Sequence, residues 1–195
     1  MTASTHRRFS VTFALLGALL LKIDTVNYYL MVIILITFSK FGGLFPDLDH
    51  HWKSVKEKTD LNWILNKMLR LTGAKHRSWQ THSWDIAIIF SILAWRLPDI
   101  LYENYSILSI VDKEMIKVML FGYSLGWFSH LFGDMLNNSG VRVVCWNKFR
   151  IKLVPKQLFG LKFKTGEDWE SFCNSFEKYI NRLIGLVVII YPFIR

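Results

Sequence analysis

The chain has 195 residues, of which 52% are hydrophobic and 20% are charged, and its formal net charge is +9. This composition excludes an intrinsically disordered protein, and two cysteines, Cys145 and Cys173, are too few for a disulfide scaffold. The length predicts a single domain over residues 1–195. A mean hydropathy of +0.26 indicates more apolar surface than one soluble core would bury, so we expect a membrane as the first neighbour of this chain.

Five apolar runs predict helices. They cover residues 11–21, 26–45, 86–95, 116–132 and 183–194. Because a helix needs roughly 20 apolar residues to cross a bilayer, the second and fourth runs come closest to spanning length. The predicted fold class is all-α, a multi-helix bundle embedded in a membrane. The shorter runs leave open an alternative, a very apolar but soluble helical bundle.

Basic and non-basic connections alternate between these runs. Lys and Arg are frequent at the N-terminus and in the segments 46–83 and 134–182, and they are scarce at 22–24 and 99–114. Because basic connections stay on the cytoplasmic side, this alternation predicts five helices threading the inner membrane, with those three basic regions in the cytoplasm. The first run also resembles a signal peptide, but no small-residue cleavage site follows it, so we expect it to be retained.

The segment between the fourth and fifth runs departs from the helical pattern. Weak alternation of apolar and polar residues at 151–154 and 161–164 predicts one short β-hairpin near 151–164. Thr165 and Gly166 predict a turn that leads into a helix beginning near Glu167.

Histidine and aspartate side chains gather beside the apolar runs. The four clusters are His6; Asp47, Asp49, His50 and His51; His76 and His82; and His130 with Asp134. His130 and Asp134 are four residues apart, so one face of a helix presents both. Asp47 and Asp49 repel each other unless a cation neutralises them. Imidazole with carboxylate is the ligand set of catalytic zinc and related sites, and the predicted threading brings all four clusters to the cytoplasmic ends of helices.

Simpler roles exist for each of these residues taken singly. Asp47 or Asp49 is also suited to a turn or a helix cap, and His130 with Asp134 to a pair on a helix surface. His51 is the weakest candidate, because one of two adjacent histidines usually points away. Arg77 suits either an anionic substrate oxygen or a basic membrane interface. The convergence of four clusters on one rim favours the shared site.

Several motifs in order resemble a known family. They are Pro46-Asp47-Leu48-Asp49-His50, His76-Arg77 with Thr81-His82-Ser83, and Ser129-His130-Leu131-Phe132-Gly133-Asp134 with Gly140-Val141, joined by Thr5-His6 and Phe163-Lys164-Thr165-Gly166. They resemble the bacterial inner-membrane metal-dependent hydrolases, which are grouped with the zinc-dependent phospholipase C and nuclease superfamily. The resemblance covers nearly the whole chain and implies a divalent metal centre, with zinc as the expected ion. The ligands it implies are His6, Asp47, Asp49 or His50, His76, His82, His130 and Asp134.

The leading hypothesis is a membrane-bound hydrolase. Metal-activated water would attack a phosphoester or a similar bond, with Asp47 or Asp49 as general base and Arg77 on an anionic oxygen. The site would face the cytoplasm, where lipid headgroups or a soluble phosphoester reach it. The sequence describes no pocket and therefore no particular substrate.

Two other functions compete with this hypothesis. The first is a membrane protein without enzymatic activity, whose metal is structural and whose basic loops bind a partner. The second is a nucleic-acid binder, because Phe149, Phe159 and Phe163 are interleaved with basic residues over 148–164. We place nucleic acid last, since Lys and Arg beside membrane helices already account for the charge.

Overall fold

A computed structural model describes residues 2–21, 25–50, 59–104, 112–136, 140–146, 148–153, 157–158, 161–162 and 168–194. The helices in these ranges are α1 (Ala3–Ala18), α2 (Thr25–Leu44), α3 (Asp60–Leu71), α4 (Trp84–Asn104), α5 (Lys113–Met135) and α6 (Asp168–Ile194), with a 3₁₀ turn η1 (Pro46–Asp49) after α2. The five apolar runs fall in α1, α2, α4, α5 and α6, which confirms the predicted all-α fold. The amphipathic helix α3 adds a sixth that no apolar run indicates.

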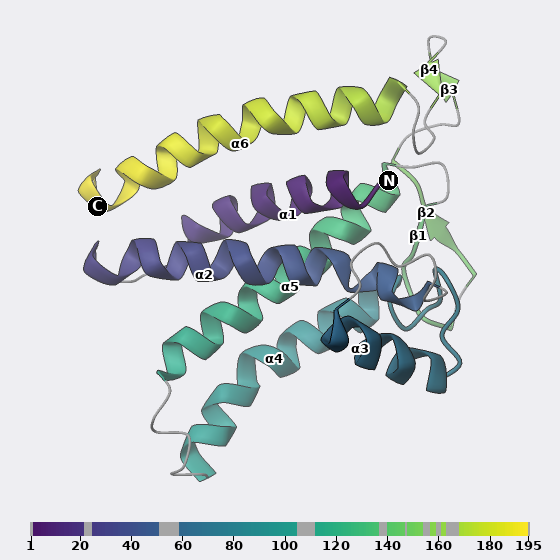
Figure 1. Ribbon diagram of the computed structural model, residues 1–195, viewed down its shortest axis with the longest axis horizontal. Coiled ribbons are helices and arrows are strands. Elements are labelled where there is room, and N and C mark those ends of the chain that lie inside the picture. Colours follow the sequence, from purple (N-terminus) through teal and green to yellow (C-terminus); the bar gives the residue numbers. More distant parts are fainter. Residues whose placement is uncertain are drawn as a thin grey trace.

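The helices form a bundle whose two ends differ. In Figure 1, α6, α1 and α2 run side by side, while α5 crosses α2 obliquely and α4 packs against α5. The N-terminus and the strands lie at one end of this bundle, and the C-terminus of α6 lies at the other.

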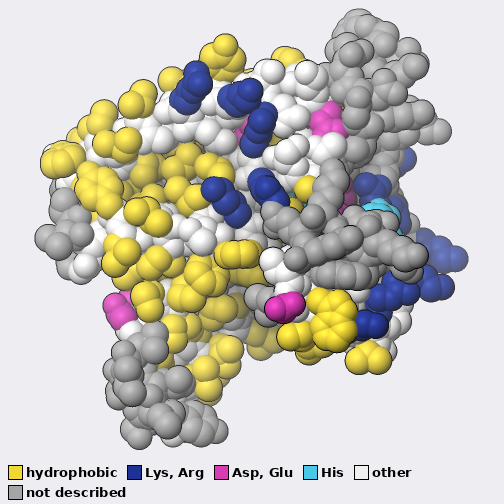
Figure 2. Space-filling view, in the orientation of Figure 1, with side chains coloured by type: hydrophobic (Ala, Val, Ile, Leu, Met, Phe, Trp, Pro, Cys, Tyr) yellow, Lys and Arg dark blue, Asp and Glu magenta, His cyan; other side chains and the backbone are white. Residues whose placement is uncertain are grey.

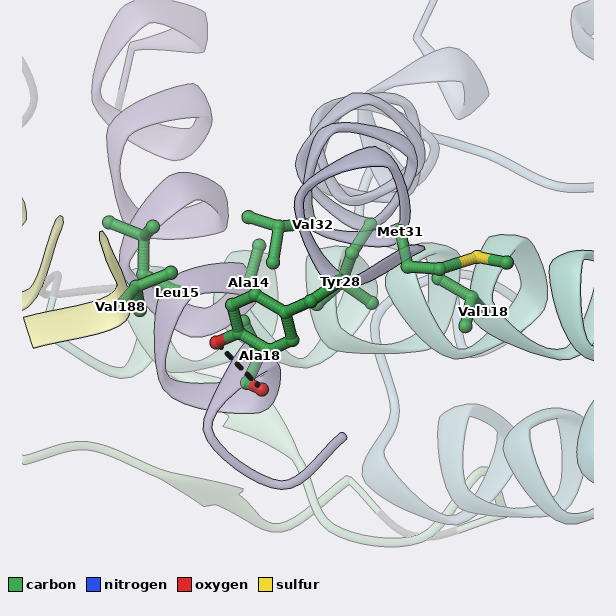
Figure 3. Close-up of a cluster of buried hydrophobic side chains, with 9 residues drawn as sticks. Ala14, Leu15, Ala18, Tyr28, Met31, Val32, Val118 and Val188 are labelled. Carbon is green, nitrogen blue, oxygen red and sulfur yellow. Dashed lines mark hydrogen bonds between the residues drawn. The ribbon is translucent and has the colours of Figure 1, made fainter. Parts of the chain in front are cut away.

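The apolar core lies where α1, α2, α5 and α6 meet. Figure 3 shows this cluster, in which Tyr28 and Val32 of α2 pack on Ala14 of α1, and Val118 and Val188 close it from α5 and α6. The Tyr28 hydroxyl donates a hydrogen bond to the Ala18 carbonyl at 3.3 Å. Full burial of each large apolar side chain stabilises the fold by about 1.5–3 kcal/mol. This cluster therefore holds together the end of the bundle that lies away from the strands.

Two glycines one turn apart let α5 approach the backbone of α2. A Cβ atom added at Gly122 would lie 2.6 Å from the Leu35 carbonyl oxygen, and one at Gly126 would lie 1.9 Å from the Ser39 carbonyl oxygen. Small residues at this spacing are typical of close helix pairs in membranes. Because α2 leads into η1, this contact fixes where η1 lies relative to the end of α5.

Buried hydroxyl groups join α1, α2 and α5 near the same level. The Ser10 and Ser129 hydroxyls lie 2.9 Å apart, and the Ser39 hydroxyl donates to the Ser10 carbonyl at 2.8 Å. In an apolar environment the hydrophobic effect contributes little to helix association, and hydrogen bonds of this kind help to hold the helices together.

A polar seam, not indicated by the sequence, joins α1 to α6. The hydroxyls of Thr5 and Thr12 donate to the buried carboxylates of Glu170 and Glu177. The Arg8 guanidinium donates to the Asn174 carbonyl at 3.0 Å. Residues 170, 174 and 177 recur on one helix face, so α6 presents a polar stripe that holds the first turns of α1 in place.

Short strands form two antiparallel pairs beside the helix ends. β3 (Gln157–Leu158) pairs with β4 (Leu161–Lys162), so a short hairpin lies within the predicted range 151–164, but its first strand is at 157–158 and not at the predicted 151–154. β1 (Val141–Arg142) pairs with β2 (Arg150–Ile151), a pairing that the sequence does not indicate. Gly140 enters β1 with φ +62°, a backbone conformation that favours glycine. The Thr165-Gly166 turn and the start of a helix at Glu167 lie outside the described residues.

One described stretch, Asn27–Asp49, has the length and composition of a membrane span, with 23 residues and a mean hydropathy of 1.7. It contains nearly all of the second apolar run. The helix that contains the fourth run does not combine the same length with a high enough mean hydropathy and few enough charges. The threading of all five helices stays a prediction.

The outer surface of the bundle is strongly apolar. Figure 2 shows hydrophobic side chains over the end away from the strands, with Lys and Arg over the middle and the strand-bearing end. Exposed side chains here include Ile88, Ile89, Ile92 and Leu93 of α4 and Leu183, Leu186, Ile189 and Ile190 of α6. An apolar surface of this extent indicates an apolar neighbour.

Candidate metal centre

Five side chains from four parts of the chain meet at the strand-bearing end of the bundle. His6 comes from the first turn of α1, Asp47 from η1, His82 from the residues before α4, and His130 and Asp134 from the end of α5. Four of them are buried, and Asp47 is 32% exposed. The hydrogen-bonded hydroxyls of Ser10, Ser39 and Ser129 hold α1, α2 and α5 together. The neighbouring ends of these helices therefore bring the side chains close to one another.

One group of metal-ligand atoms comprises His82, His130 and Asp134. The Nε2 atoms of His82 and His130 lie 3.6 and 3.8 Å from Asp134 Oδ2. Two atoms that share one Zn²⁺ at about 2.0–2.2 Å each are at most about 4.2–4.4 Å apart, so these separations suit a common ion. They are too long for hydrogen bonds.

A second group comprises His6, Asp47 and His130. His130 Nε2 lies 3.8 Å from Asp47 Oδ1, and His6 Nε2 lies 3.6 Å from the Oδ1 atom of Asp134. The His6 and His130 rings stack with their centroids 3.7 Å apart. His130 belongs to both groups, and the two oxygens of Asp134 face different histidines. The five side chains therefore suit one ion, or two ions bridged by Asp134.

The orientation of two imidazoles fits a cation. His130 Nδ1 lies 2.7 Å from the Gly43 carbonyl oxygen, which can only accept a hydrogen bond, so His130 presents the lone pair of Nε2 to the centre. The buried Nε2 atoms of His82 and His130 make no hydrogen bond with any residue in the described part of the chain. Buried polar atoms without a partner are costly, and a metal ion would satisfy both.

Asp49 lies behind His82 rather than among these ligand atoms. Its fully buried carboxylate accepts a hydrogen bond from the Thr81 hydroxyl at 2.6 Å, and its Oδ2 atom lies 3.3 Å from His82 Nδ1. Trp127 Nε1 donates to the Thr81 carbonyl at 2.8 Å and holds this segment against α5. A carboxylate beside the outer nitrogen of a histidine fixes the ring orientation, which is the arrangement found around many metal sites.

His76 and His50 lie at the exposed edge of the site. Their rings stack with centroids 3.5 Å apart, and His76 Nδ1 lies 3.3 Å from Asp49 Oδ1. The His76 side chain is 39% exposed. Burial, followed by the charge of His76, lowers the pKa of His50. Neither histidine belongs to the two groups of ligand atoms.

Arg77 approaches the centre from the other side of Asp134. One guanidinium nitrogen lies 3.6 Å from Asp134 Oδ1, and the side chain is 25% exposed. Its backbone has φ +59°, in the left-handed region that non-glycine residues rarely occupy. The positive charge of Arg77 therefore lies beside the candidate ligands.

Comparison with known families adds one finding. The YdjM inner membrane protein family matches residues 1–190. The chain belongs to this family. No curated protein and no solved structure matches it. The family confirms the inner-membrane part of the predicted resemblance, and the hydrolase part stays a prediction.

In this YdjM family member, the predicted site residues fall into three sets. His6, Asp47, His82, His130 and Asp134 form the groups of ligand atoms, Asp49 with His76 supports His82, and His50 lies at the edge. His51 lies outside the described residues. The assignment of each residue as a ligand stays a prediction. Sequence reasoning missed the Gly43 carbonyl and Trp127, and no local pattern marks either of them.

Proposed function

We propose that this YdjM family member is a membrane-bound, metal-dependent hydrolase acting on a phosphoester or a similar bond. The proposal rests on the convergence of five histidine and aspartate side chains, in which the buried Nε2 atoms of His82 and His130 make no hydrogen bond to the described residues. A divalent cation such as Zn²⁺ bound there supplies a Lewis acid and lowers the pKa of water to about 7, which makes hydroxide available at neutral pH.

The side chains divide the work according to their exposure and contacts. His6, His82, His130 and Asp134 are buried and suited to hold the cation. Asp49 keeps His82 oriented through the contact at Nδ1. Asp47 is the more exposed carboxylate, so the oxygen that it does not give to the cation is the one suited to accept a proton from an attacking water.

The hydrolase proposal is tested with purified protein in nanodiscs, loaded with Zn²⁺. We expect hydrolysis of bis(4-nitrophenyl) phosphate, and we expect Asp47→Asn to lower the rate by about 10²–10⁴-fold, the usual contribution of a general base. Glu103→Gln, which removes an exposed carboxylate from the end of α4, should leave the rate unchanged. A metal-loaded chain that cleaves neither this diester nor 4-nitrophenyl phosphate would contradict the proposal.

A structural metal site is the second candidate function. It is favoured by the burial of His6, His130 and Asp134, each at most 2% exposed, because structural sites are closed by protein ligands. Cobalt substitution separates the two functions. An absorption spectrum that shifts when azide is added indicates an open position, and a spectrum that does not shift indicates a closed shell.

We propose that the chain is a multi-pass protein with the metal centre on the cytoplasmic side, in contact with membrane lipids. The exposed apolar side chains of α4 and α6 suit the lipid interior, and the basic residues near the centre suit the cytoplasmic face. Helix α3 suits the interface between them, because Trp63 and Met68 are exposed and Lys67 lies 5.7 Å above the Trp63 ring.

The orientation predicts opposite labelling at the two ends of the bundle. With Cys145 and Cys173 replaced by serine, Trp79→Cys should react with an impermeant thiol reagent only after lysis, because residue 79 is 43% exposed beside the site. The Glu114 side chain is 63% exposed at the start of α5, so Glu114→Cys should react in intact spheroplasts. The reverse pattern would place the centre in the periplasm.

A further inference from the structure

Two arginines face each other across the short sheet next to the metal centre. The register of β1 and β2 pairs Arg142 directly with Arg150, and both side chains are half-buried. Like charges placed directly opposite in an antiparallel pair destabilise it. An anion placed between the two guanidinium groups would offset this repulsion.

A third arginine reaches the same place from the loop before α4. Arg142 forms a backbone bridge with Ser83, the residue after His82, so β1 lies against the segment that carries Arg77 and His82. The buried Nε atoms of Arg77 and Arg142 make no hydrogen bond within the described residues. The backbone of Arg77 is left-handed, and strain of this kind tends to persist at ligand sites.

The charges of these groups act on one another. Burial, then the positive charges of Arg142 and Arg77, lower the pKa of Arg150, while the Asp134 carboxylate opposes this shift. The geometry agrees with this: β1 and β2 pair Arg142 with Arg150, the bridge to Ser83 brings β1 to the segment of Arg77, and Arg77 lies 3.6 Å from Asp134 Oδ1. Guanidinium groups bind phosphate oxygens with paired hydrogen bonds, and three of them can hold the three non-bridging oxygens of a phosphate monoester.

We propose that Arg77, Arg142 and Arg150 form a phosphate-binding subsite that adjoins the metal centre and defines the substrate as a phosphate ester. This inference rests on the proposed hydrolase and deepens it by naming the group that is bound. The arginines hold non-bridging oxygens of the phosphate, and His130 and Asp134 lie on the side where the ester bond is cleaved. A lipid headgroup and a soluble phosphate ester both carry this chemistry.

The subsite is tested by phosphate binding to metal-free protein in nanodiscs of zwitterionic lipid. We expect inorganic phosphate to bind, as followed by calorimetry. Arg142→Gln should weaken this binding by about 10- to 100-fold, as expected for the loss of charge-assisted hydrogen bonds. Arg96→Gln removes the same charge from the exposed surface of α4 and should have no effect. Since no metal is present, this result is independent of whether the chain hydrolyses anything.

Further variants keep the test decisive if Arg142→Gln fails to fold. Arg142→Lys keeps the charge but loses the paired donors, so it should bind phosphate with intermediate affinity. Competition distinguishes the sources: a short-chain phosphatidylglycerol that displaces phosphate better than glycerol 3-phosphate does indicates a lipid headgroup, and the opposite order indicates a soluble ester. Equal phosphate affinity in the wild type, Arg142→Lys and Arg77→Gln, or no phosphate binding to the wild type, would overturn the proposal.

Discussion

Replacing His130 by alanine should abolish metal binding while leaving the helices intact. His130 is the residue shared by both groups of ligand atoms, and its Nε2 atom lies 3.8 Å from carboxylate oxygens of both Asp47 and Asp134. Removing a ligand should weaken metal binding by more than the roughly 10- to 100-fold that is typical of removing a residue that only orients a ligand. Elemental analysis of the purified variant measures the metal, and far-UV circular dichroism measures the helices.

His50→Ala is the matched control for this prediction. His50 is also a histidine at the end of an apolar run, but its ring stacks on His76 and lies outside both groups of ligand atoms. We expect this variant to keep its metal. If both variants keep their metal, His130 does not belong to the site, and if both lose it, the site extends to His50.

Gly126→Ala should separate α2 from α5 and lower the stability of the whole bundle. The added Cβ would lie 1.9 Å from the Ser39 carbonyl oxygen and 2.6 Å from the Gly43 backbone nitrogen, so the helices must move apart. Overpacking of this kind costs about 1–3 kcal/mol. Because the Gly43 carbonyl holds His130 in place, we also expect weaker metal binding. Thermal unfolding in detergent, with and without Zn²⁺, measures both effects.

Gly185→Ala provides the comparison on α6. Outside its own helical turns, no atom of the described residues lies within 4 Å of the Cβ that this change adds, so it tests the same substitution without a clash. Alanine favours a helix over glycine by about 1 kcal/mol, and the variant should be at least as stable as the wild type. If Gly126→Ala melts at the same temperature as Gly185→Ala, the close approach of α2 and α5 is not what holds the bundle.

The parts of the fold that depend on local sequence could be predicted. Each apolar run is continuous in the chain, so the five helices that contain these runs follow from the sequence. Helix α3 contains no continuous apolar run, because polar residues such as Asn62 and Lys67 interrupt its apolar ones, so the apolar runs alone do not indicate it. The pairing of β1 with β2 joins residues eight and ten positions apart through two-residue strands, which leaves almost no pattern to detect.

The candidate site could be predicted in its membership more than in its geometry. His130 and Asp134 lie one helical turn apart, so their shared face follows from the spacing alone. Asp47 and Asp49 look equivalent in the sequence, yet Asp49 contacts Thr81 and His82 while Asp47 faces His130. That difference depends on which residues from distant segments pack against η1, and no local rule supplies it.

The metal content of the wild-type protein, purified from membranes without chelators, tests the central claim most directly. We expect elemental analysis to find at least one divalent ion per chain, and X-ray absorption at its edge to show nitrogen and oxygen neighbours at about 2.0–2.2 Å, as histidine and carboxylate ligands require. A chain that carries no divalent metal and takes none up when Zn²⁺ is supplied, while its helices stay folded, would contradict the claim that His6, Asp47, His82, His130 and Asp134 form a metal centre.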